Sequence, residues 1–178
     1  MKQNRYQVEG KKFFVVDLEL DIDLCGDLSK AKHERILDDN GRLQYDAYYL
    51  NGQLHGPSTF YSDEETILSL TWFYLGKKQG MAWRYYLSGK LYCLERFKNN
   101  LSHGKQEYFY EDGTLKTLLH YKGGELHGEA RLFWPQGTPK RFCCYENGKK
   151  IGFDRIWDET GKLIQEEEYA KTAAGAVP

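Results

Sequence analysis

The sequence predicts an all-β protein, an elongated repeat sheet of stacked β-hairpins with about six repeats. The first observation behind this prediction is a set of glycines at 24-residue intervals: Gly56, Gly80, Gly104, Gly128 and Gly152. A period between 20 and 50 residues is typical of a repeat array. Counting back one period from Gly56 places the start of the first repeat at Lys32, and the last repeat ends near Ala170.

Two further turn signals recur along the repeats. The first lies nine residues after the marker position, at Asn40-Gly41, Ser88-Gly89, Asp112-Gly113, Gln136-Gly137 and Thr160-Gly161, with Glu65 in the remaining copy. The second lies twenty residues after it, at Asn51-Gly52, Leu75-Gly76, Asn99-Asn100, Gly123-Gly124 and Asn147-Gly148. Asn and Gly tolerate the positive φ that two-residue hairpins require. Each repeat is therefore expected to hold two short strands.

Apolar positions follow the same period and favour strands over helices. Seventeen residues after each marker stand Tyr49, Phe73, Phe97, Tyr121, Tyr145 and Tyr169, and five residues after it stand Leu37, Tyr61, Tyr85, Phe109, Phe133 and Trp157. Aromatic side chains suit a pleated surface, and the segments between glycines are too short for stable helices. These columns are expected to form side-chain ladders along the sheet.

The two ends of the chain differ from the repeats. In residues 1–31, apolar side chains from Val16 to Leu24 alternate with acidic ones, which is typical of a half-buried strand. We expect one N-terminal capping strand over residues 13–24, followed by a connector, with an acidic outer face formed by Asp17, Glu19, Asp21 and Asp23. Residues 171–178 are small and are expected to form a disordered tail.

The repeats resemble the variant class of MORN repeats (membrane occupation and recognition nexus). Residues 80–91 (GMAWRYYLSGKL) and 104–115 (GKQEYFYEDGTL) carry the resemblance, as do the joints at residues 51–56 (NGQLHG) and 124–128 (GELHG). The sequence departs from the pattern at Lys32, Glu65, Asn100 and Pro139. The resemblance implies a binding role: bacterial proteins built of this variant resemble antitoxin or immunity partners of toxins, and related arrays serve as scaffolds or contact phospholipid.

Composition narrows the class of function. The chain has 178 residues, a net charge of −1 and a pI near 6.5, which does not indicate a nucleic-acid partner. The N-terminus is polar and no apolar run is long enough to span a bilayer, so neither a signal peptide nor a membrane span is expected. The four cysteines, Cys25, Cys93, Cys143 and Cys144, match no zinc module. We expect a cytoplasmic protein.

No candidate catalytic or metal centre emerges from the sequence. His55, His103 and His127 each precede a marker glycine. Equivalent positions in neighbouring repeats are expected to lie about 10 Å apart, which is too far for these histidines to share a metal ion. A structural role in the turns is therefore favoured. A calcium loop beginning at Asp21 fails at Cys25 and Lys32. The acidic runs at 63–65 and 166–168 are expected to be solvated. We therefore expect no enzyme activity and no cofactor.

The remaining interpretation is a protein-binding module, with a toxin as one possible partner. Tyr, Trp and Arg are enriched at interface hot spots. The candidate contact residues are those that the repeat pattern does not require, namely Trp72, Tyr74, Arg84, Tyr86, Arg96, Tyr108, Tyr110 and Trp134. The acidic face of the N-terminal strand is a further candidate. The alternative is a peripheral membrane or scaffold module that binds anionic lipid, which the interleaved acids disfavour. The oligomeric state is left open.

Overall fold

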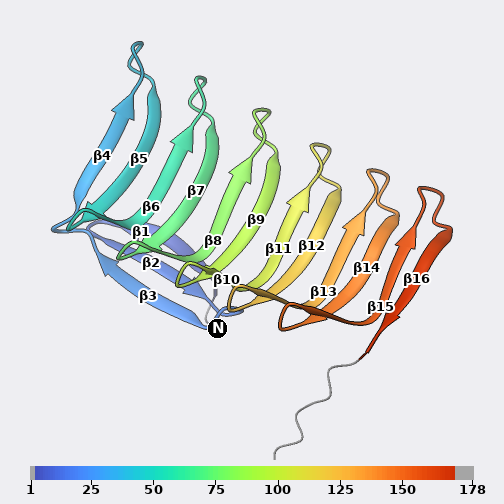
Figure 1. Ribbon diagram of the computed structural model, residues 1–178. Helices are drawn as coiled ribbons and strands as arrows, with labels where there is room; N and C mark the ends of the chain where they lie inside the picture. The colour runs from blue at the N-terminus through green and yellow to red at the C-terminus, as the bar shows by residue number, and fades with distance from the viewer. Residues whose placement is uncertain (1–2, 171–178) are drawn as a thin grey trace, which may run out of the picture.

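Two antiparallel sheets make up the computed structural model, which describes residues 3–170 (Figure 1). The N-terminal sheet contains β1 (Arg5–Glu9), β2 (Lys12–Asp17) and β3 (Ile22–Asp27). The repeat sheet contains β4 (Lys32–Leu37), β5 (Leu43–Leu50), β6 (Gln53–Tyr61), β7 (Ile67–Tyr74), β8 (Lys77–Tyr85), β9 (Leu91–Lys98), β11 (Gly104–Phe109), β12 (Leu115–Lys122), β13 (Glu125–Phe133), β14 (Pro139–Glu146), β15 (Lys149–Trp157) and β16 (Leu163–Tyr169). The short strand β10 (Leu101–Ser102) pairs with β9 beside this row.

The structure confirms the all-β repeat architecture. Successive hairpins lie side by side in sequence order from β4 to β16, and the row is not closed into a barrel (Figure 1). We call the turns within a repeat tip turns and the turns between repeats joint turns. All five joint turns have two successive residues with positive φ, as the Asn-Gly and Gly-Gly pairs predict. The marker glycines also have positive φ, for example 76° at Gly104 and 107° at Gly128.

Four of the five joint turns are held by hydrogen bonds to the preceding repeat. The amide of Gly76 donates to the carbonyl of Leu54 at 2.8 Å, and the same bond recurs at the next three joints. A second bond comes from the side chain before the marker glycine. In each case a backbone amide of the turn donates to this side chain. The amides and acceptors are Leu75 N to His55 Nδ1 (3.2 Å), Asn99 N to Gln79 Oε1 (3.2 Å), Gly123 N to His103 Nδ1 (3.3 Å) and Asn147 N to His127 Nδ1 (3.5 Å). The turn role predicted for the histidines is thereby confirmed.

His55 provides a test of this bond through pH. Its pKa is lowered because burial penalises the charged form, while a backbone hydrogen bond with Asp27 acts in the opposite direction. A lowered folded pKa means that stability is fully present above pH 6.5, the unfolded value, and is lost as the pH falls through the folded value. His55→Gln should keep an acceptor, as Gln79 does one repeat later, but should not titrate.

We therefore expect the free energy of unfolding of wild type to fall relative to that of His55→Gln between about pH 7.5 and pH 5. Urea titrations at several pH values measure this difference. Parallel pH profiles for the two proteins would contradict the assignment.

The tip turns are joined by three long polar side chains. Tyr86 Oη donates to the carbonyl of Phe109 at 2.8 Å, and Tyr110 Oη donates to that of Phe133 at 2.9 Å. Trp134 Nε1 donates in the same way to the carbonyl of Trp157 at 3.2 Å. Tyr86, Tyr110 and Trp134 thus bind the next repeat of their own chain.

The single capping strand expected over residues 13–24 is wrong. This segment forms most of β2, a four-residue turn and the first half of β3, with Asp17 paired to Ile22 and a positive φ of 51° at Asp21. Asp17 is fully buried, where its carboxylate accepts the hydroxyl of Tyr6 at 2.5 Å and the amides of two turn residues. The expected acidic face is therefore wrong at Asp17, whereas the turn residues Glu19 and Asp21 and the β3 residue Asp23 are exposed.

The N-terminal sheet covers part of one face of the repeat sheet and does not cap its edge. We call this the covered face; it carries Trp72, Trp83 and Arg131. The core consists of Phe13, Val15, Leu20, Ile22 and Leu28 from the N-terminal segment, packed with Trp72. The edge strands β4 and β16 remain almost fully exposed. Within residues 3–170 the structure contains no helix, so no helical segment there crosses a membrane.

Candidate functional site

The N-terminal sheet reaches only part of the way along the covered face. Its contacts extend to Arg96, whose guanidinium lies 3.7 Å from the Glu19 carboxylate, and to Lys98, whose ammonium donates to the carbonyl of Leu20 at 3.0 Å. Its farthest contact is the Leu20 side chain against Gly104, at the start of β11. Strands β12–β16 extend beyond it without an overlying element (Figure 1). The N-terminal sheet therefore covers this face over the first repeats and leaves the same face exposed over the last ones.

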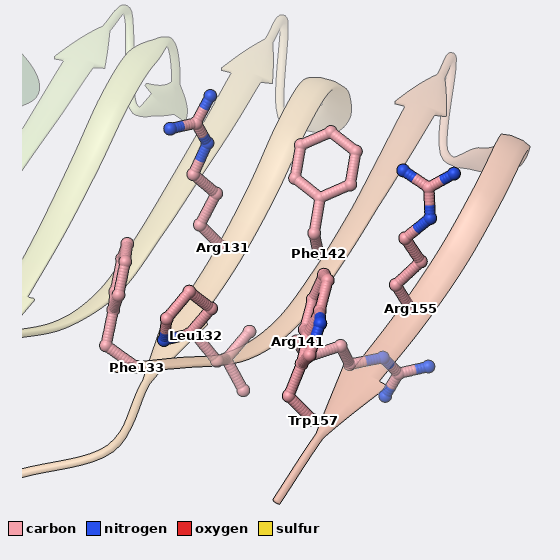
Figure 2. A pocket seen from close by; sticks show the side chains of 8 residues that line it. Arg131, Leu132, Phe133, Arg141, Phe142, Arg155 and Trp157 are labelled. Atoms are coloured by element: carbon pink, nitrogen blue, oxygen red, sulfur yellow. The ribbon is translucent and has the colours of Figure 1, made fainter. Parts of the chain in front are cut away.

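This open part carries a groove of about 320 Å³ (Figure 2). Its lining residues are Arg131, Leu132, Phe133, Pro139, Arg141, Phe142, Arg155 and Trp157. Arg131, Phe142 and Arg155 are direct cross-strand neighbours on β13, β14 and β15. The Arg131 guanidinium lies 5.7 Å from the centre of the Phe142 ring. The groove thus combines an aromatic floor with two arginines.

Both arginines are free to exchange partners. Arg131 pairs with Glu129 at 2.7 Å and Arg155 pairs with Glu166 at 2.5 Å, and their side chains are 45% and 38% exposed. Exposed ion pairs of this kind contribute about 0–1 kcal/mol. A ligand carboxylate can therefore replace either glutamate at little cost.

Arg141 differs because it is fixed on the opposite face. It donates two hydrogen bonds to Asp154, at 2.8 and 2.5 Å, and Lys150 donates a third to the same carboxylate at 2.6 Å. These bonds lower the pKa of Asp154 to about 2 despite its burial. Removing Arg141 from this group would leave a buried charge with one fewer partner, so Arg141 supports the sheet beneath the groove.

The contact residues predicted from the sequence do not lie together in the structure. Trp72 and Arg96 are buried, at 3% and 6% exposure, so neither is a free contact residue. Tyr74 packs against the N-terminal core, with its ring centre 5.1 Å from that of His55. The remaining predicted residues of the repeats lie at the tip turns, as described above, or on the opposite face.

Arg84 and Tyr108 form a small cluster on that opposite face. Tyr108 Oη donates to Glu95 at 3.0 Å, and Arg84 lies 3.4 Å from the other oxygen of Glu95. Burial and the negative charge of Glu95 raise the pKa of Tyr108. The two residues are therefore brought together, but away from the groove.

Nucleophilic chemistry has little support at three of the four cysteines. Burial raises the pKa of Cys93 to about 11, and it also raises the pKa values of Cys143 and Cys144. A thiol with a raised pKa is a poor nucleophile. Within residues 3–170, no group of three or more His, Cys, Asp or Glu side chains is placed to hold a metal ion.

Two aromatic residues of the groove were absent from the sequence prediction because they occupy a regular repeat column. Phe133 and Trp157 belong to the aromatic column five residues after the marker, which was interpreted as structural. One signal was available: the N-terminal segment is too short to cover all six repeats. The same columns must then be buried at one end of the array and open at the other.

Comparison with known protein families supports the MORN interpretation. The family model of the MORN repeat variant matches residues 102–122 and 155–171. MORN repeats are in general modules that bind proteins or membrane lipids. No curated protein matches the chain.

Proposed function

We propose that the chain is a non-enzymatic protein-binding module whose partner docks in the groove over β13–β15. The observation that carries this proposal is the groove itself, an aromatic surface beside Arg131 and Arg155 that the N-terminal sheet leaves open. Aromatic and Arg side chains dominate the energetics of protein interfaces. From the resemblance of the repeats to those of bacterial antitoxins, we further propose a more specific role for this module, as an antitoxin that masks a toxin.

Alanine substitution in the groove tests the docking site. Phe142→Ala and Trp157→Ala should each weaken partner binding at least about tenfold, which corresponds to about 1.4 kcal/mol. The matched control is Phe60→Ala, because Phe60 is a 51% exposed aromatic residue on the opposite face. The tagged chain is used to capture the protein encoded by the adjacent reading frame, and affinities are then measured by calorimetry.

The outcomes separate the two classes of partner. Equal losses for Phe60→Ala and Trp157→Ala would contradict the groove as the site. Binding to vesicles that contain anionic phosphatidylserine, without capture of the adjacent gene product, would replace the protein partner with a lipid surface. For the antitoxin role, co-expression should relieve growth inhibition by that gene product, and Trp157→Ala should abolish the relief.

A further inference from the structure

The two edge strands of the repeat sheet, β4 and β16, are the same kinds of strand that pair with each other at the internal joints. Strand β4 begins the first repeat and β16 ends the last one, and each is hydrogen-bonded to a neighbour on one side only. Both edges are exposed along almost their whole length. At every joint inside the chain, the second strand of one repeat, which corresponds to β16, pairs with the first strand of the next repeat, which corresponds to β4. A second copy of the chain can therefore continue the row.

The internal joints define the register of such a contact. The residue fourteen after one marker pairs with the residue three after the next, as in Leu70 with Trp83 and Phe142 with Arg155. One period beyond Phe142 is Glu166, and one period before Thr59, which pairs with Asp46, is Arg35. The same register places Glu166 directly opposite Arg35 of a second copy.

Charges on both edges fit this register. Within the chain, Glu166 pairs with Arg155 at 2.5 Å, and Arg35 lies 3.5 Å from Asp46. Joining the edges places these two pairs side by side, in the order Arg155, Glu166, Arg35 and Asp46 across four neighbouring strands. Opposite charges on adjacent strands stabilise a sheet.

One like-charge contact opposes the pairing. The same register places Glu167 opposite Glu34 of the second copy. Glu34 is already paired with Lys32 at 2.9 Å, and Glu167 accepts a hydrogen bond from Tyr169 at 2.8 Å, so both carboxylates keep a local partner. The N-terminal core reaches as far as Tyr48 on β5, the neighbour of β4, and a second copy would pair with the other side of β4.

We propose that copies of this chain associate head to tail, with β16 of one copy pairing antiparallel with β4 of the next in the register of the internal joints. The two surfaces differ, so the contact is heterologous and does not close a dimer. Association then yields open rows of copies whose length grows with concentration.

Charge reversal at each edge gives a sharp test. Glu166→Arg blocks the β16 edge and leaves β4 intact, whereas Arg35→Glu blocks β4 and leaves β16 intact. Sedimentation velocity of the full chain, from about 1 μM to about 1 mM, measures association. Wild type should form species that grow with concentration, and each variant alone should need at least about fivefold higher concentration.

An equimolar mixture of the two variants contains one wild-type joint and one joint in which both charges are reversed, so that opposite charges face each other in both joints. Mixing should therefore restore the association that each variant alone lacks. Lys105→Glu, an exposed charge reversal on the interior strand β11, should associate as wild type does. Should either reversal unfold the chain, Glu166→Gln and Arg35→Gln provide milder blocks of the same edges.

Three results would overturn the proposal. These are a wild type that stays monomeric over the whole range, single variants that associate like wild type, and a mixture that associates no better than the single variants.

Discussion

Gly26→Ala is expected to destabilise the protein about as much as removal of the Phe13 side chain, by about 3–5 kcal/mol. A Cβ atom at Gly26 would lie 1.9 Å from Cε1 of Phe13 and 2.2 Å from its Cζ. Phe13 is fully buried beneath the repeat sheet, so its ring has no free space to enter. The backbone of Gly26 is ordinary, and the expected cost therefore comes from the lost packing of Phe13 alone.

Urea unfolding followed by tryptophan fluorescence measures this loss. Cys25→Ala is the matched control, because Cys25 is the exposed neighbour of Gly26 on β3. The double variant Gly26→Ala/Phe13→Ala should cost little more than either change alone, since both remove the same contact. A loss below about 1 kcal/mol for Gly26→Ala would show that the ring can move aside.

Trp72→Ala is expected to cost a similar amount, about 3–5 kcal/mol, and to release the N-terminal sheet. Trp72 is 3% exposed and its ring centre lies 6.1 Å from those of both Tyr6 and Phe13. Its indole N–H is buried and has no hydrogen-bond acceptor within the described residues. Trp72→Phe should therefore lose much less stability, because it keeps the ring and removes the unsatisfied donor.

Trp157→Ala is the control for this experiment, because Trp157 lies on the open groove and no N-terminal residue covers it. Urea unfolding measures stability, and limited proteolysis between residues 3 and 31 measures release of the N-terminal sheet. Equal destabilisation by Trp72→Ala and Trp157→Ala would contradict the role given to the N-terminal sheet.

The repeat sheet could be predicted from sequence because its determinants are local. A pair such as Asn147-Gly148 imposes positive φ and reverses the chain regardless of what packs on it. The positive φ of the marker glycines is likewise a local property that does not depend on what packs against them. The period, the turns and the strand order therefore follow from the sequence alone.

The N-terminal sheet could not be predicted in the same way, because its turn preserves the alternation of a strand. Four turn residues separate Asp17 from Ile22, so apolar and acidic residues continue to alternate through the reversal. Asp21 provides the positive φ there, but an Asp in this position carries a weaker signal than a glycine. The buried role of Asp17 depends on Tyr6, which lies eleven residues away.

The burial of two candidate contact residues could not be predicted for a related reason. Trp72 and Arg96 belong to a variable column that also contains His120 and Cys144, and variable columns suggest a solvent-facing surface. The column varies because the N-terminal sheet covers its first members and leaves the later ones open. Which members are covered depends on packing between segments more than 70 residues apart.

The partial reach of the N-terminal sheet also sets how the array can change in length during evolution. Its contacts end at Gly104, so the first three repeats and the start of the fourth form the smallest row that it can cover completely. Beyond that point each hairpin depends only on its neighbours, as in other repeat arrays. Duplication or loss of a 24-residue unit after β11 would leave every contact of the N-terminal sheet intact, and it would lengthen or shorten the exposed binding face.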